Sequence, residues 1–392
     1  MITGLPVLEE TDWSRLHHAY GRATDTPGHL RALLEEEAER RKKAFDHLWS
    51  AIIHQGTPWT ATGPVALFIA GLLGDETLAR RVRPIRADLF EFLLSVAHLA
   101  GLWEEEAAAL ERTEADHGHD LDALIDAGDD DALYDESTGE AFYARALLGC
   151  VRAAPALVAV MLEGLTDADP VVRAHASAGA VALAKCEPMR GHLSEFESRL
   201  TALARTAQDA DERSAHVLAL GDLGAALADL LEDPSPAVRI CAALTPGLAG
   251  NAAATSELLD ALKHHAADID GWFTNTPPQF SFRPRFSVVA RLVEQVKDFE
   301  LLVDAAVAVL PVATKYTVDY DWGPLLAAAF PDGSGVVKTE AQRRFLAALV
   351  DRRQLWDAKF WNPREWFQKA GLPYDRQACA ELVRDFHTDA TP

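Results

Sequence analysis

Basic residues are scarce in this chain. Its 37 lysines and arginines stand against 60 aspartates and glutamates, which gives a formal net charge of −23 over 392 residues. Such an acidic chain repels a phosphate backbone, because nucleic-acid recognition needs clustered cations. The composition therefore argues against nucleic acid as a partner. It favours another protein, a basic one, whose approach the negative field would accelerate.

Cysteines and long apolar runs are scarce as well. The four cysteines are widely spread and form no C-x-x-C pair, and three of them lie in apolar stretches typical of small core residues. No apolar run reaches about 18 residues without a charge. The N-terminus has neither the basic start nor the apolar core of a signal peptide. The sequence therefore predicts a cytoplasmic protein that does not engage a membrane.

Familiar catalytic motifs are missing too. The chain has no G-x-G-x-x-G fingerprint, no phosphate-binding loop with its lysine, no G-x-S-x-G elbow and no H-E-x-x-H pair. No catalytic residue, cofactor or metal site is therefore predicted, and the sequence favours a binding protein over an enzyme.

A repeated segment is the clearest feature that is present. Residues 165–173 (LTDADPVVR) return as residues 231–239 (LEDPSPAVR), and a partial copy at 209–213 (DADER) lies between them. Each copy is expected to form the elbow between two helices. Alanine-rich helices follow the full copies, and alanine is the best helix former.

Three positions of the repeat have expected structural roles (Asp167, Pro170, Arg173, Asp233, Pro236 and Arg239). The aspartates can cap the next helix by accepting its free N–H groups. The prolines fit the first helical turn, where a missing N–H costs nothing. The arginines can pair with an aspartate of their own or of a neighbouring turn and so form a ladder.

The D-x-x-P-x-V-R frame with its alanine/leucine helix resembles the HEAT-repeat family. A second block at 54–73, with Trp59, Pro64 and Val65, is similar to the N-terminal block of actinobacterial HEAT-repeat proteins. Together the two likenesses cover roughly residues 45–250. They imply an all-α fold, a HEAT-like α-solenoid of stacked antiparallel helix pairs, because a single pair cannot bury its apolar face alone. Some members resemble immunity or accessory proteins encoded beside toxins or biosynthetic enzymes. A role in neutralising a basic toxin, such as a nuclease, fits the negative charge of this chain.

Composition divides the chain into three predicted regions. Residues 1–136 are expected to form N-terminal helical repeats that end in an acidic stretch, residues 137–268 the repeat core, and residues 269–392 an aromatic-rich helical cap with a proline/aromatic loop. One long helix is expected from Pro27 to about His54, and Pro155 is expected to open a new helix.

The acidic stretch between Trp103 and Ala144 contains fifteen carboxylates and few cations. Three interpretations compete: a solvated acidic loop, a docking surface for a basic protein, and a metal site at residues 116–120. The spacing does not match a calcium-binding EF-hand loop. The docking interpretation selects five aspartates (Asp126, Asp129, Asp130, Asp131 and Asp135).

The stretch 271–286 is rich in proline and aromatic residues and cannot be a regular helix. A long ordered loop of this kind is often functional. We therefore expect partner or ligand contacts from this loop and from a second aromatic cluster (Trp272, Phe273, Arg283, Arg285, Tyr320 and Trp322). The alternative to a protein-binding scaffold is a small-molecule-binding protein or an enzyme with a pocket under the loop at 269–286.

Overall fold

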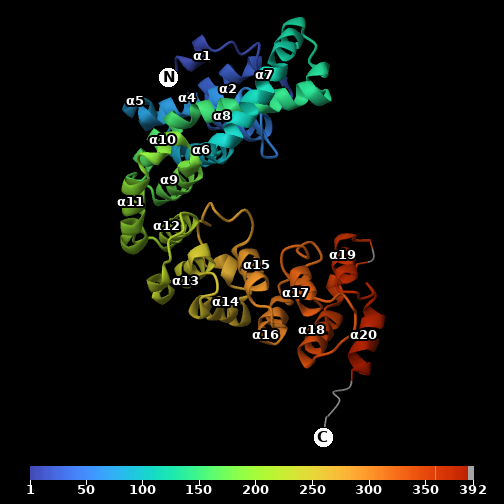
Figure 1. The fold of residues 1–392 in the computed structure, drawn as a ribbon. Helices are drawn as coiled ribbons and strands as arrows, with labels where there is room; N and C mark the ends of the chain where they lie inside the picture. The colour runs from blue at the N-terminus through green and yellow to red at the C-terminus, as the bar shows by residue number, and fades with distance from the viewer. Residues whose placement is uncertain (358, 387–392) are drawn as a thin grey trace. The chain divides into compact units, whose positions relative to one another are not determined.

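The predicted all-α class is confirmed. The structure, a computed structural model, describes residues 1–357 and 359–386. Over these residues the chain forms twenty α-helices, several short 3-10 or π-helical turns, and two hairpins of two-residue strands. The chain divides into two compact units, unit 1 (Met1–Leu203) and unit 2 (Ala204–Pro392), and Figure 1 shows the order of their helices by colour.

Unit 1 contains both hairpins, the first after α1 and the second after α3, and is otherwise mostly helical. In the hairpins β1 (His17–His18) pairs with β2 (Gly21–Arg22), and β3 (Ile53–His54) pairs with β4 (Thr57–Pro58). The helices are α1 (Val7–Glu10), α2 (Thr26–Ala32), α3 (Ala38–His47), α4 (Thr62–Gly74), α5 (Glu76–Arg81), α6 (Arg86–Ala100), α7 (Glu104–Ala127), α8 (Glu136–Gly164), α9 (Pro170–Ala182), α10 (Glu187–Arg190) and α11 (Leu193–Thr206), which runs across the boundary between the units.

The expected single helix over residues 27–54 is wrong. The chain leaves the helix after Ala32 and resumes it at Ala38, and α3 then runs into a π-helical turn at Leu48–Ile52. Leu33 and Leu34 are both buried in the break. Two successive residues of a regular surface helix point in directions about 100° apart, so the interruption helps to bury both leucines.

The acidic stretch is not a loop. Most of it forms α7, whose first turn contains Glu104, Glu105 and Glu106. Carboxylates are favourable there because the N-terminal end of a helix has a partial positive charge. Gly128 ends the helix with a φ of 75°, the left-handed conformation that glycine adopts readily.

Helix α8 is the core helix of unit 1. It contacts α4, α6, α7 and α9, and it continues through Pro155, so the prediction that this proline opens a helix is wrong. By length and composition α8 is the one described helix apolar enough to cross a membrane, yet 56% of its most apolar window is buried within the protein. Packing on both sides accounts for its apolar composition and for its continuity at the proline.

In unit 2 each helix from α13 onward contacts the helix two positions later along the chain. The contacts join α14 to α16, α16 to α18 and α18 to α20, and they join α13 to α15, α15 to α17 and α17 to α19. The helices are α12 (Ala210–Asp222), α13 (Pro236–Leu244), α14 (Ala252–His265), α15 (Pro284–Gln295), α16 (Phe299–Val309), α17 (Trp322–Ala329), α18 (Glu340–Asp351), α19 (Asn362–Lys369) and α20 (Arg376–Asp385).

The three repeat copies share one local geometry. In each copy the arginine donates to the backbone carbonyl six residues earlier: Arg173 to Asp167 at 2.5 Å, Arg213 to Ala207 at 2.9 Å and Arg239 to Asp233 at 3.0 Å. The arginine thus satisfies a carbonyl at the elbow, and the partial copy is equivalent to the full ones in this respect.

The capping role predicted for Asp167 and Asp233 is wrong. The residues at the N-caps are Asp169, Asp209 and Ser235. Of these, Asp169 and Asp209 accept helix N–H groups with their side chains. Asp167 and Asp233 instead accept the N–H two residues later, at 2.9 and 2.8 Å, which fixes the turn before the helix. Pro170 and Pro236 do lie in the first helical turn.

One step of the expected arginine–aspartate ladder is present within unit 2. The guanidinium of Arg213 lies 3.0 Å from the carboxylate of Asp233, the next copy along the chain, and both side chains are largely buried. In unit 1 Asp167 pairs with Arg86 at 2.6 Å, and in unit 2 Arg239 pairs with Glu257 at 2.8 Å. The repeat positions therefore form ion pairs, but their partners also come from outside the repeat.

Candidate functional site

Two of the five predicted docking aspartates are already paired within unit 1. Asp126 forms an ion pair with Arg15, and Asp130 lies 2.9 Å from the guanidinium of Arg22 and 3.2 Å from the ring of His17. The hydrogen bond from Arg22 is the main reason why the pKa of Asp130 is lowered. These contacts fasten the end of α7 to the first hairpin, so Asp126 and Asp130 have an internal structural role.

The other predicted aspartates remain exposed. Asp129, Asp131 and Asp135 form no ion pair among the described residues. Several carboxylates of α7 and of the start of α8 also form none. We call this set the acidic surface (Glu105, Glu111, Asp116, Asp120, Asp129, Asp131, Asp135, Glu136 and Glu140). Uncompensated carboxylates near the C-terminal end of α7 are unfavourable for the helix, because that end already has a partial negative charge.

The 269–286 loop is fixed to α12, the helix that begins at the partial repeat copy. The backbone N–H of Asn275 donates to Asp211 at 2.6 Å, and the Gln279 side chain donates to the carbonyl of Ala215 at 2.9 Å. Asp211 occupies a position that is apolar in the two full copies. The departure of this copy from the repeat pattern is therefore explained by its contact with the loop.

Three of the six residues expected to contact a ligand or partner are core residues. Phe273, Arg285 and Trp322 are buried, with exposed fractions of 6%, 3% and 1%. Trp272 is half-buried and contacts His265. Phe273 and Trp322 therefore offer almost no surface to a partner, because their apolar side chains pack inward.

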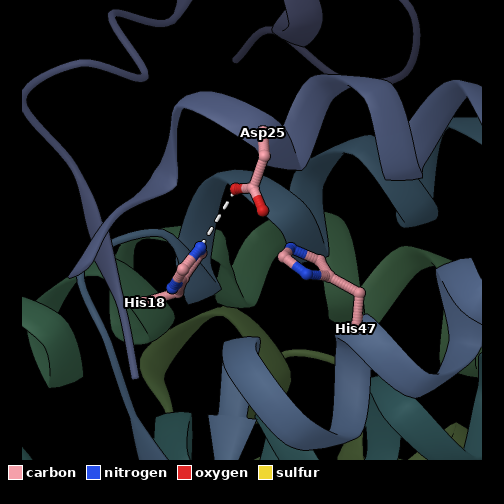
Figure 2. Close-up of side chains that lie close together, drawn as sticks. All are labelled: His18, Asp25 and His47. Carbon is pink, nitrogen blue, oxygen red and sulfur yellow. Dashed lines mark hydrogen bonds and ion pairs between the residues drawn. The ribbon is translucent and has the colours of Figure 1, made fainter. Parts of the chain in front are cut away.

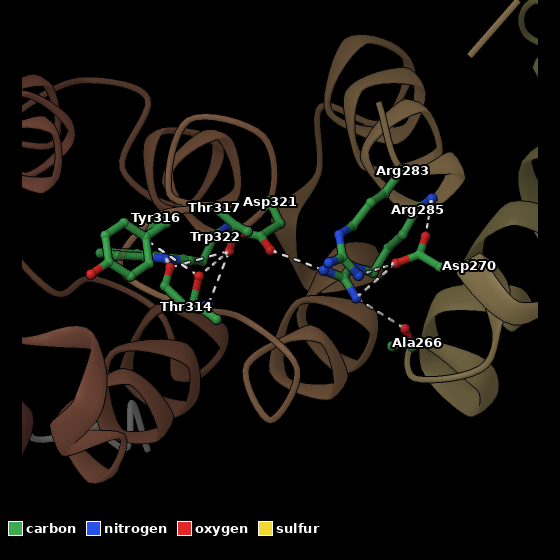
Figure 3. A network of polar contacts seen from close by, with 9 residues as sticks. All are labelled: Ala266, Asp270, Arg283, Arg285, Thr314, Tyr316, Thr317, Asp321 and Trp322. Atoms are coloured by element: carbon green, nitrogen blue, oxygen red, sulfur yellow. Dashed lines mark hydrogen bonds and ion pairs between the residues drawn. The ribbon is translucent and has the colours of Figure 1, made fainter. Parts of the chain in front are cut away.

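Arg285 is the centre of a buried polar network, shown in Figure 3. Its guanidinium lies 3.4 Å from Asp321 and 3.5 Å from Asp270. Burial raises the pKa of Asp321 to about 6, and the N–H of Trp322 and the guanidinium oppose this rise. The network joins the loop before α15 to the segment before α17, which is a structural role.

Two of the predicted residues do reach the surface of unit 2. Arg283 is exposed and pairs with Asp270 at 3.4 Å. Tyr320 is 39% exposed and lies between the rings of Phe282 and Phe286, with ring centroids 4.7 and 5.1 Å away. The ring of Phe286 also contacts the Arg285 network, since the guanidinium carbon of Arg285 lies 5.3 Å from its centroid.

A groove does lie beside the loop, with other lining residues. It has a volume of about 530 Å³, and its walls come from α12, the end of α13, the loop and α15 (Leu218, Asp222, Leu244, Gln279, Phe280, Ser287, Ala290, Arg291 and Glu294). None of the predicted ligand-binding residues lines it. The expected pocket under the loop is thus placed differently from the prediction, on the side that faces α12.

A histidine cluster that the sequence did not single out lies in unit 1, as shown in Figure 2. Ring nitrogens of His18 and His47 and a carboxylate oxygen of Asp25 all lie within 4.8 Å of one another. His18 Nε2 is 3.0 Å from Asp25, and His29 Nε2 is 3.9 Å from the other oxygen of this carboxylate. His29 also stacks on His47 with ring centroids 4.1 Å apart.

Three elements bring the cluster together. His18 lies in β1, Asp25 directly precedes α2 and His47 ends α3. His18 and His47 are buried, while Asp25 is exposed, so one side of the cluster opens to solvent. Burial, together with the neighbouring His29, lowers the pKa of His47 to about 4, which keeps its imidazole neutral near pH 7.

No chain-local pattern brings the three residues together, because they are separated by 7 and 22 residues. The i, i+4 spacing of Asp25 and His29 joins only one member of the cluster to a neighbouring histidine. The candidate metal residues of 116–120, by contrast, lie along α7, and the described structure does not gather them into a set of converging ligands.

Neither the models of known protein families nor the curated proteins contain a match to this chain. We therefore infer the function from the residues, their charges and their geometry.

Proposed function

We propose that the chain is a HEAT-type helical-repeat scaffold that binds a basic protein through the acidic surface of unit 1. The fold part of the proposal is supported by the contacts between alternate helices of unit 2, which are those of two parallel layers in an α-solenoid. The shared elbow geometry of the three repeat copies supports it as well.

The unpaired carboxylates of the acidic surface are the observation that carries the binding part. Unit 1 contains 34 aspartates and glutamates against 18 lysines and arginines, and unit 2 contains 26 against 19. The excess is therefore largest in the unit that contains α7. The field of such a surface attracts cationic partners and increases their association rate by 10- to 1000-fold, with a steep decrease as salt is added.

Charge neutralisation tests the proposal. The variant Asp129→Asn/Asp131→Asn/Asp135→Asn removes three negative charges and keeps side-chain size. A matched control, Glu232→Gln/Glu300→Gln/Glu365→Gln, removes three exposed carboxylates from unit 2. All three proteins are used to capture partners from cells that produce the chain, at low and at high salt.

We expect the wild-type protein and the control to retain the same basic protein at low salt. The Asp→Asn variant should retain several-fold less of it, and high salt should release it from all three. Capture that does not differ between the two triple variants would contradict the proposed role of the acidic surface.

The groove beside the 269–286 loop supports a second candidate function, the binding of a small molecule. Its walls combine Leu218, Leu244 and Phe280 with charged groups, the mixture typical of ligand sites. Replacement of Ala290 by Trp would fill the groove from α15. A compound that raises the melting temperature of the wild-type protein but not of this variant would support the candidate, and equal stabilisation of both proteins would count against it.

A further inference from the structure

We propose that His18, Asp25 and His47 bind one divalent transition-metal ion, for which zinc is the best match, with His29 as a fourth donor. This site is independent of the proposed partner binding. The three principal donor atoms already lie within 4.8 Å of one another and come from three different elements of unit 1.

The arrangement needs side-chain rotations to hold an ion, and His29 must also leave its stack on His47, because two parallel rings cannot both direct a nitrogen lone pair at the same ion. Zinc binds imidazole nitrogen and carboxylate oxygen at about 2.0–2.2 Å, so donors around one ion are separated by roughly 3–4 Å. His18 and Asp25 are 3.0 Å apart, and His29 is 3.9 Å from Asp25. Burial of His18 and His47 limits the motion of their rings, while the exposed Asp25 gives an ion access from solvent.

The donor types select the class of metal. Three imidazoles and one carboxylate suit zinc, cobalt and nickel, whereas magnesium and calcium prefer all-oxygen sites. The hydroxyl of Thr26 lies 3.0 Å from Nε2 of His47 and fixes the orientation of this ring. Such outer hydrogen bonds are a regular feature of histidines that bind metals.

The hydrogen bonds of His18 dictate what must change when the ion binds. The backbone N–H of Tyr20 donates to Nδ1 of His18 at 3.1 Å, so the ring proton is on Nε2, which donates it to Asp25. An ion at Nε2 replaces this proton, and the neutral ring then has its proton on Nδ1. The bond from Tyr20 must break, and the exposed turn between β1 and β2 must reorient.

The Tyr20 amide therefore reports on metal binding at this site independently of the binding measurement. Loss of the bond to His18 should shift the amide resonance of Tyr20 and increase its hydrogen exchange. A metal ion adsorbed elsewhere on the acidic chain would leave the Tyr20 amide unchanged.

The test uses the full chain after treatment with a chelator. Zinc is titrated by calorimetry, cobalt is added to record visible d–d absorption, and the Tyr20 amide is followed by NMR. The variants Asp25→Asn and His47→Gln remove one donor each. The control His117→Gln/His119→Gln removes two histidines from α7, and circular dichroism shows whether each variant is folded.

We expect one zinc ion per chain, with the absorption of a tetrahedral cobalt site and a shifted Tyr20 amide. Each donor variant should weaken binding by about 10- to 100-fold or more, because the loss of even an outer-shell partner of a ligand has an effect of this size, and the control should bind like the wild-type protein. No stoichiometric binding, equal binding by a folded donor variant, or binding without a change at Tyr20 would overturn the proposal. None of these outcomes affects the capture experiment, which probes other residues.

Discussion

The buried carboxyl of Asp321 should make unit 2 less stable as the pH rises. Its pKa is raised from 3.8 to about 6 because the group is buried, even though Arg285 lies 3.4 Å away. The folded protein therefore binds this proton more tightly than the unfolded chain does. The stabilising contribution is complete below about pH 4 and is lost as the pH rises through about 6.

The size of this effect follows from the two pKa values. One pKa unit corresponds to about 1.4 kcal/mol, so the complete titration lowers the free energy of unfolding by about 3 kcal/mol. About 2 kcal/mol of this falls between about pH 4 and about pH 7, because the unfolded carboxyl is already partly ionised at the lower value.

Replacement of Asp321 by Asn tests the effect, because asparagine does not titrate. Calorimetric unfolding of both full-length proteins is measured across this pH range. We expect the advantage of the wild-type protein over the variant to decrease by about 2 kcal/mol from about pH 4 to about pH 7. The control is Asp332→Asn, at a site where Lys338 lowers the pKa to about 2, so its difference from wild type should change little above about pH 5. A difference between wild type and Asp321→Asn that is constant across the range would refute the reasoning.

Two further substitutions test the packing and the repeat. At Gly71 an added methyl group would lie 2.1 Å from the backbone nitrogen of Gly4, whereas at Gly74 it would meet nothing within 4 Å. Gly71→Ala should therefore lower the free energy of unfolding by about 1–3 kcal/mol and reduce the melting temperature, whereas Gly74→Ala should lower neither. In Arg213→Met the largely buried Asp233 loses its partner at 3.0 Å, and we expect denaturant unfolding to show a loss of about 3 kcal/mol; a loss below about 1 kcal/mol would argue against the ladder step.

Local sequence patterns predicted many of the helices well. Pro170 and Pro236, for example, lie in the first turns of α9 and α13 as expected, and alanine-rich helices follow both full copies of the repeat. These patterns act within one turn of helix, through proline geometry and apolar periodicity. The same rules failed at Pro155, where packing of α8 on its neighbours outweighs a local helix signal.

The site could not be predicted to the same degree, because its contacts join distant parts of the chain. Asp126 is paired with Arg15, 111 residues earlier, and Asp130 with Arg22, 108 residues earlier. The sequence shows these aspartates as one uniform acidic run. It contains no sign that two of them are neutralised while Asp131 stays exposed.

Which aromatic residues are exposed could not be predicted from the sequence for a related reason. Composition marks Trp322 as a candidate anchor for a ligand, but it cannot distinguish an exposed anchor from a buried core residue. The structure buries Trp322 and exposes Tyr316 and Trp361, which are 65% and 69% exposed. Which side of a segment faces the core is fixed by tertiary packing.

Hydrogen exchange of the full chain with its captured basic partner tests directly whether the acidic surface binds that partner. We expect slower exchange of backbone amides in residues 105–140 of unit 1, and loss of this protection in Asp129→Asn/Asp131→Asn/Asp135→Asn. Protection confined to the 269–286 loop and the groove beside it, with residues 105–140 unchanged, would contradict the account.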